Sequence, residues 1–187
     1  MDTFIAKRIG RNRQAGMSLI ELMIAMTVLV VGMLALITLV TTAISSNNRN
    51  KLDTTGTMLA QTVLEGIAAQ PATSNQPFKM KDCNPAGSTE FIIATAPDAS
   101  SSSVTVVPNT GNVDFSQPYS SITAHYAMLY VTCGVNGAQA TYDVRWNVLT
   151  LTNFTKLVTV SARQLGATGA NLPFFSLPIT LRTIAGH

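Results

Sequence analysis

The sequence predicts an α+β fold in which a long hydrophobic N-terminal α-helix packs on a C-terminal antiparallel β-sheet domain. Three observations lead to this prediction. An apolar run spans residues 17–44, an amphipathic helical stripe follows it, and from Phe78 onward apolar residues recur at alternating positions. A membrane segment followed by one domain of ordinary size fits the 187 residues.

The apolar run is long enough to cross a bilayer, which takes about 20 apolar residues. It carries one charge, Glu21. A carboxylate at the centre of a membrane helix costs roughly 2.5–3.5 kcal/mol, and less near an interface, so Glu21 predicts a partner. Cleavage after Gly16 would place a new amino group on Met17, one helical turn from Glu21. In a staggered stack of identical helices, the amine of one subunit can then meet the carboxylate of the next.

The helix is expected to continue beyond the membrane. Residues 45–51 are polar and weak in helix propensity. Apolar residues then recur at spacings of seven, four and four, and Pro71 ends the pattern because proline lacks the N–H donor. The stripe consists of Leu52, Leu59, Val63 and Ile67. Two arrangements fit: one helix over about 18–69, or two helices with a break near residues 47–50.

The second half of the chain reads as a meander of short strands. Strands are expected at 90–95, 103–107, 122–133, 140–151 and 156–162, with turns at 134–137 and 152–155. In the clearest strand, Tyr142, Trp146 and Val148 share one face. This face is expected to pack against the apolar stripe of the helix. The opposite face, with Asp143 and Arg145, is expected to face water, as one side of an antiparallel sheet often does.

The two cysteines, Cys83 and Cys133, predict one disulfide, because an even pair beyond a membrane segment fits an oxidising compartment. Free structural thiols are the alternative. A metal site would need more ligands than His125 and His187 offer, and no Cys-x-x-Cys occurs. No cofactor is therefore expected.

The positive charge of the chain is concentrated at its N-terminus. The leader, residues 1–16, holds four of the 12 Lys and Arg residues and one of the nine Asp and Glu residues. Its loss would leave eight of each. Positive flanks stay in the cytoplasm, so the domain is expected outside. The mature chain has no basic excess to favour nucleic acid, and none is predicted as a partner.

No catalytic pattern stands out. The sequence lacks Gly-x-Ser-x-Gly, a phosphate-binding glycine loop and His-Glu-x-x-His. The chain is therefore expected to be no enzyme.

The segment Gly16-Met17-Ser18-Leu19-Ile20-Glu21 resembles the class III signal of type IV prepilins and type II secretion pseudopilins. The resemblance implies cleavage between Gly16 and Met17 by a prepilin peptidase, N-methylation of Met17, and a role for Glu21 in assembly register. Met17 stands where the family usually has Phe. The continuation over residues 30–36 is similar to PilV-like minor pilins, and Thr38 replaces the helix-kinking proline of major pilins.

The resemblance implies a pilin-like fold with a leader at 1–16, a membrane or fibre-core helix at 17–44, an amphipathic half-helix at 45–70 and a β domain at 71–187. It implies a minor pilin that passes once through the inner membrane and then joins a surface pilus or periplasmic pseudopilus. The implied partners are prepilin peptidase, other major and minor pilins through the N-terminal helix, the inner-membrane assembly platform and the membrane itself.

Other readings of the same segment remain open. The machine could be a type II secretion pseudopilus or a DNA-uptake pilus, because these share the motif. The segment could also anchor a periplasmic binding module without being cut. A secretory signal cleaved at 41–43 is a third alternative, although its apolar region would normally be about 7–15 residues long and uncharged.

Overall fold

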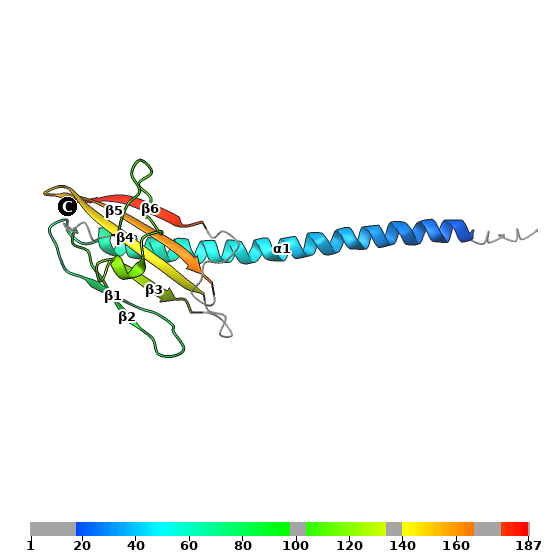
Figure 1. The fold of residues 1–187 in the computed structure, drawn as a ribbon, viewed down its shortest axis with the longest axis horizontal. Helices are drawn as coiled ribbons and strands as arrows, with labels where there is room; N and C mark the ends of the chain where they lie inside the picture. Colours follow the sequence, from blue (N-terminus) through cyan, green and yellow to red (C-terminus); the bar gives the residue numbers. More distant parts are fainter. Residues whose placement is uncertain (1–17, 98–103, 134–139, 167–176, 187) are drawn as a thin grey trace, which may run out of the picture. The chain divides into compact units, whose positions relative to one another are not determined.

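The computed structural model describes residues 18–97, 104–133, 140–166 and 177–186 (Figure 1). It divides into two compact units, Met1–Asn47 and Asn48–His187.

One helix, α1, runs from Leu19 to Ala68. The polar residues 45–51 are helical, so no break interrupts the helix there. At its C-terminal end, the Ala69 N–H still donates to the Glu65 carbonyl at 2.8 Å, and Pro71 follows two residues later. The predicted stop at this proline is thus confirmed, and the one-helix alternative is the observed one.

The strands form two antiparallel sheets. The small sheet pairs β1 with β2, and the large sheet has the order β3-β4-β5-β6. Their bounds are β1 Phe78–Lys81, β2 Glu90–Ile93, β3 Ala127–Val131, β4 Thr141–Thr152, β5 Thr155–Leu165 and β6 Ile179–Gly186. A long N-terminal apolar helix with a C-terminal antiparallel sheet confirms the predicted α+β class.

The core lies between the second half of α1 and one face of the large sheet. The buried side chains of the helix stripe, Leu59, Val63 and Ile67, belong to the same apolar cluster as Trp146 and Val148 of β4. The packing face predicted from the alternation in β4 is therefore the observed one. Trp146 is fully buried, and its indole N–H donates to the Ala94 carbonyl at 3.0 Å.

Two glycines let α1 approach its neighbours. A Cβ on Gly66 would overlap the ring of Phe78, and one on Gly56 would lie 3.3 Å from the ring of Tyr142. Both glycines thus provide room for aromatic rings.

The second face of the large sheet is not the wet face that the sequence predicted. Asp143 and Arg145 are almost completely buried there, at 2% and 3% exposure. The segment over residues 104–121 crosses this face and covers them. Arg145 donates to the carbonyls of Asp114 and Gln117, and Asn147 donates to that of Val104. Alternation along β4 correctly separated the two faces, but a loop distant in sequence decided that the second one is covered.

Several strand boundaries also differ from prediction. The strand expected at 122–133 begins only at Ala127, because the chain turns at His125, whose φ is 74°. Within the described part of 103–107, the only pairing is an isolated bridge between Val106 and Val113. The turn expected at 134–137 lies outside the described residues, whereas the turn at Asn153 and Phe154 between β4 and β5 is present. Strands β1 and β6 were not predicted.

Candidate functional site: the N-terminal helix and its processing motif

Glu21 lies in the first turn of α1, two residues after the helix begins at Leu19. Its N–H donates to the Ser18 carbonyl at 3.0 Å, and the N–H of Leu22 donates to the same carbonyl at 3.2 Å. A carboxylate in the first turn is favoured by the helix dipole. The side chain is exposed in the isolated chain. It is thus available to a partner.

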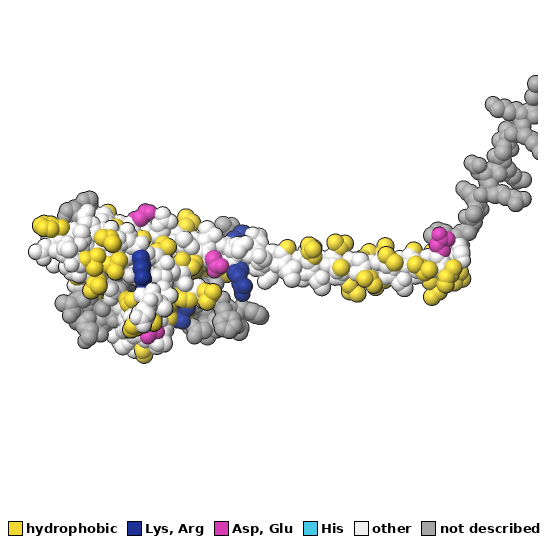
Figure 2. Space-filling view, turned by 90° about the horizontal axis from the view of Figure 1, so that it is seen from above, with side chains coloured by type: hydrophobic (Ala, Val, Ile, Leu, Met, Phe, Trp, Pro, Cys, Tyr) yellow, Lys and Arg dark blue, Asp and Glu magenta, His cyan; other side chains and the backbone are white. Residues whose placement is uncertain are grey.

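The apolar side chains of α1 between Leu19 and Ile44 are exposed. Every large apolar side chain between Leu19 and Ile44 is at least 48% exposed, and yellow side chains follow this part of the helix in Figure 2. An exposed apolar surface of this size marks contact with a membrane or with other chains. By length and composition, α1 can cross a membrane.

The threonines in this apolar stretch keep their hydroxyl groups satisfied within the helix. Thr27 donates to the Ile24 carbonyl and Thr38 to the Ala35 carbonyl, both at 2.8 Å. Thr41 and Thr42 bond in the same way to carbonyls three and four residues earlier. An internally bonded hydroxyl costs less to move into an apolar phase than a free one. These threonines therefore fit a helix that is to be surrounded by lipid or by other apolar helices.

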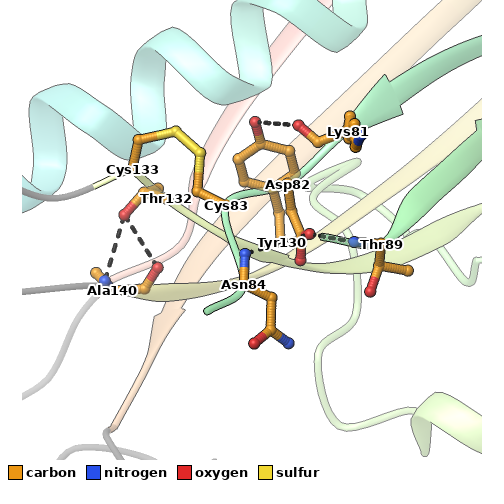
Figure 3. The surroundings of a disulfide bond; sticks show 9 residues. All are labelled: Lys81, Asp82, Cys83, Asn84, Thr89, Tyr130, Thr132, Cys133 and Ala140. Carbon is orange, nitrogen blue, oxygen red and sulfur yellow. Dashed lines mark hydrogen bonds between the residues drawn. A yellow bond between two sulfur atoms is a disulfide. The ribbon is translucent and has the colours of Figure 1, made fainter. Parts of the chain in front are cut away.

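A disulfide joins Cys83 and Cys133, whose Cα atoms are 5.0 Å apart (Figure 3). It ties the segment after β1 to the segment after β3. The backbone supports this link, because the Cys83 N–H donates to the Val131 carbonyl at 3.0 Å. Tyr130 adds a hydrogen bond from its hydroxyl to the Lys81 carbonyl, and buried Asp82 accepts from the Thr89 N–H. The disulfide therefore attaches the small sheet to the edge of the large one.

Of the predicted processing and assembly residues, the structure describes only Glu21. Gly16 and Met17 lie outside the described residues, so the distance between Met17 and Glu21 is not defined. Gly16, Met17 and Glu21 all lie within a segment that matches a known family model. Residues 11–37 match the family model of the prokaryotic N-terminal methylation motif. The chain carries a type IV pilin-like prepilin signal. Comparison with curated proteins and with solved structures found no match.

The methylation motif has consequences for the whole chain. It implies processing by a prepilin peptidase and assembly with other pilins, and it points to a structural subunit and not to an enzyme. With the apolar helix, it fits a membrane-anchored pilin or pseudopilin. Within the described ranges, no three His, Cys, Asp or Glu side chains come together as metal ligands.

One cluster of charged side chains was not predicted from the sequence. Arg145 pairs with Asp143 at 2.8 Å, and Arg163 on β5 lies 3.4 Å from the same carboxylate. Both guanidinium groups also lie against the ring of Phe115, at 5.0 and 4.6 Å from its centroid. Cation–π contact with one ring joins the loop to both strands. Alternation placed Asp143 and Arg145 on one face, but no signal in the sequence linked them to Phe115.

Lys156 on β5 is a second buried charge that the sequence did not reveal. Its side chain shares the helix-facing side with Val158, and the residue is only 1% exposed. Its ammonium group donates to the Pro71 carbonyl at 3.4 Å, just beyond the end of α1. Burial lowers the pKa of Lys156 from 10.5. The partial negative charge at a helix C-terminus favours a cation there.

Proposed function

We propose that this chain is a minor pilin subunit of a type IV pilus or related filament. A prepilin peptidase would remove residues 1–16 and methylate Met17, and the subunit would assemble through its N-terminal helix. The observation that carries this proposal is the methylation motif over residues 11–37, together with the exposed apolar side chains of α1 between Leu19 and Ile44.

The electrostatics of the helix support the assembly step. Glu21 is the one charged side chain of residues 17–44 and would be costly in an apolar fibre core without a partner. The amino group of Met17 from a neighbouring subunit would supply that partner. Pairing would neutralise both charges and set the axial register of neighbouring helices.

The proposal assigns each part of the chain a role. Residues 17–44 would lie in the membrane and then in the fibre core, residues 45–70 would form the part of the spine that packs on the domain, and residues 71–187 would form the outer domain. Thr38 supports a minor subunit, because it stands where major pilins have a helix-kinking proline. The helix α1 passes through this position, and the Thr38 hydroxyl donates to the Ala35 carbonyl.

The proposal is tested first by mass spectrometry of the amino terminus, on protein from membranes and from sheared fibres. N-methylated Met17 in the sheared fraction is the expected result. A chain that starts at Met1 would favour an anchored periplasmic module, and one that starts near Ile44 would indicate a secreted domain. A type II secretion pseudopilin or DNA-uptake pilin would show the same terminus, and the loss of secretion or of uptake on deletion would then identify the machine.

A charge-removing substitution tests the assembly role of Glu21. Glu21→Gln keeps the shape of the side chain and should reduce fibre incorporation at least tenfold while leaving the outer domain folded. Glu65→Gln is the matched control, because Glu65 is an exposed residue of the same helix outside the apolar stretch, where it accepts from Gln61. Normal incorporation of Glu21→Gln would contradict the proposal.

A further inference from the structure

Two basic side chains lie on α1 shortly after its apolar stretch. Arg49 and Lys51 come five and seven residues after Ile44, and both are exposed. Among the described residues, neither charged group takes part in an ion pair or a hydrogen bond. The ion pairs of the domain are made by other cations. Arg49 and Lys51 are therefore available to an external anion.

The acidic residue nearest in sequence does not neutralise this pair. Asp53 is the one Asp or Glu between Glu21 and Glu65, and it lies one helical turn beyond Arg49. An acidic residue placed after the basic one is the weaker order for a helical ion pair. No ion pair joins Asp53 to Arg49. This turn of the helix thus keeps a net positive charge.

Arg49 and Lys51 lie on different sides of the helix. Each residue of an α-helix is rotated by about 100° from the one before it, so two positions differ by about 200°. A protein that docks on one side of α1 could reach only one of these cations. A layer of anions that surrounds the helix at this level could reach both.

The spacing along α1 places both cations at the level of lipid headgroups when Ile44 lies at the boundary of the hydrocarbon. Helix rise then puts their Cα atoms about 7–11 Å beyond this boundary, within side-chain reach of a headgroup layer about 5–8 Å thick. About 20 residues of helix cross the hydrocarbon, so the opposite boundary lies near Ile24. Glu21 would lie just outside it, where a carboxylate costs less.

We infer that Arg49 and Lys51 bind phosphate groups of the phospholipid leaflet on the side of the outer domain, before the subunit enters a filament. The inference rests on the proposed function, because it needs α1 to cross the membrane with the domain outside. A guanidinium can bind a phosphate through two parallel hydrogen bonds, and an ammonium binds it as a point charge. Phosphates surround a membrane helix on all sides, so both cations find a partner.

The polarity of the segment supports this choice of ligand. Lys and Arg are usually enriched on the cytoplasmic side of a membrane helix and not on the opposite side. Two unpaired cations directly after the apolar stretch depart from that bias, and phosphate is the anion that a membrane supplies there. The contact would also set the depth of the helix. Residues 19–44 span about 39 Å, against a hydrocarbon core of about 30 Å, so apolar length alone leaves the depth open.

Solid-state NMR of the full chain in bilayers of phosphatidylglycerol and phosphatidylethanolamine tests the inference. The arginines carry carbon-13 at the guanidinium carbon, and the leader arginines are replaced by lysine. Lipid phosphorus-31 should dephase part of the guanidinium signal, and Arg49→Gln should abolish this dephasing. Arg182→Gln is the control and should leave it unchanged, because the Arg182 guanidinium donates to the Thr110 carbonyl of the domain. Absent dephasing, or dephasing that survives Arg49→Gln, would overturn the inference.

Amine reactivity provides a second readout, for Lys51. An acylating reagent should modify Lys51 at least threefold more slowly in phospholipid vesicles than in vesicles of digalactosyldiacylglycerol, a lipid without phosphate. Lys81 is the matched control, because it is exposed on β1 of the domain, and it should react equally fast in both. Equal rates at Lys51 in the two lipids would exclude phosphate as its partner. Peptide mass spectrometry measures both sites in the same sample.

The amino terminus of the protein from cells separates the two ways of failing. N-methylated Met17 without phosphate contact at Arg49 would refute this inference alone. An uncut chain that shows the contact would refute the proposed function and leave a membrane-anchored module with the same lipid contact.

Discussion

The hydroxyl of Tyr142 on β4 donates a hydrogen bond of 2.8 Å to the backbone carbonyl of Leu52 on α1. It joins two residues 90 positions apart in the sequence. The ring lies beside Gly56, where the absence of a side chain gives it space. This contact fastens the sheet to the helix near the point where the helix enters the domain.

Tyr142→Phe should lower the free energy of unfolding by about 1 kcal/mol, because it leaves the Leu52 carbonyl without this donor. Burial raises the pKa of Tyr142 above 10.0. The contribution of the Tyr142 hydroxyl to the free energy of unfolding is therefore complete below pH 10. It is lost as the pH rises through the raised pKa of the folded state. Urea unfolding of the detergent-solubilised chain should show a difference between wild type and variant at pH 8 that shrinks toward pH 11. A difference that grows with pH would contradict this account.

Asp143→Ala should destabilise the domain by about 3–5 kcal/mol, because it leaves Arg145 buried without its counter-charge. Limited proteolysis should also cut the segment 104–121 faster, since Arg145 holds the carbonyls of Asp114 and Gln117. The exposed pair of Lys79 and Glu90 is the matched control. Lys79→Ala should cost less than about 1 kcal/mol. Equal losses of stability from the two substitutions would mean that burial does not determine how much an ion pair contributes to folding.

Gly66→Ala should destabilise the domain, although alanine is favoured over glycine within a helix by about 1 kcal/mol. The added Cβ would overlap the ring of Phe78, a side chain packed against the core. Thermal unfolding should show a lower melting temperature for this variant. Adding Phe78→Leu should recover more stability in the Gly66→Ala background than in the wild type. If Gly66→Ala alone raised the melting temperature, helix propensity would outweigh the steric contact.

Lys156→Met should raise the melting temperature near pH 8 by a few degrees, since it replaces a buried ammonium by an apolar side chain of similar length. Removing an imperfectly compensated buried charge is often neutral or stabilising. The lowered pKa of Lys156 means that the unfolded chain holds this proton more strongly. Wild-type stability attributable to this group should thus rise with pH toward 10.5, and the advantage of the methionine variant should shrink. An advantage that is independent of pH would exclude desolvation as its cause.

Local sequence patterns predicted much of the fold. The unbroken apolar run, the stripe ending at Ile67 and the proline at position 71 were enough to predict helix on both sides of residues 47–50 and its end near residue 69, because helix formation depends on neighbours a few residues apart. They did not show whether one helix or two cover this range, because residues 45–51 are polar and weak in helix propensity. The alternation of Tyr142, Trp146 and Val148 identified the packed face of β4 for the same reason. Strand β6 escaped prediction, since its exposed Ile184 and partly buried Thr180 blur the polar and apolar alternation.

The processing motif could be predicted from sequence because a peptidase reads a short linear segment, and the family comparison over residues 11–37 rests on that same segment. The covered face of the large sheet was decided only in three dimensions. Asp143, Arg145 and Arg163 meet Phe115 because a loop crosses the strands, and the distance along the chain hides that contact. The position of β6 at one end of the strand order likewise depends on long-range pairing, which has no local signature.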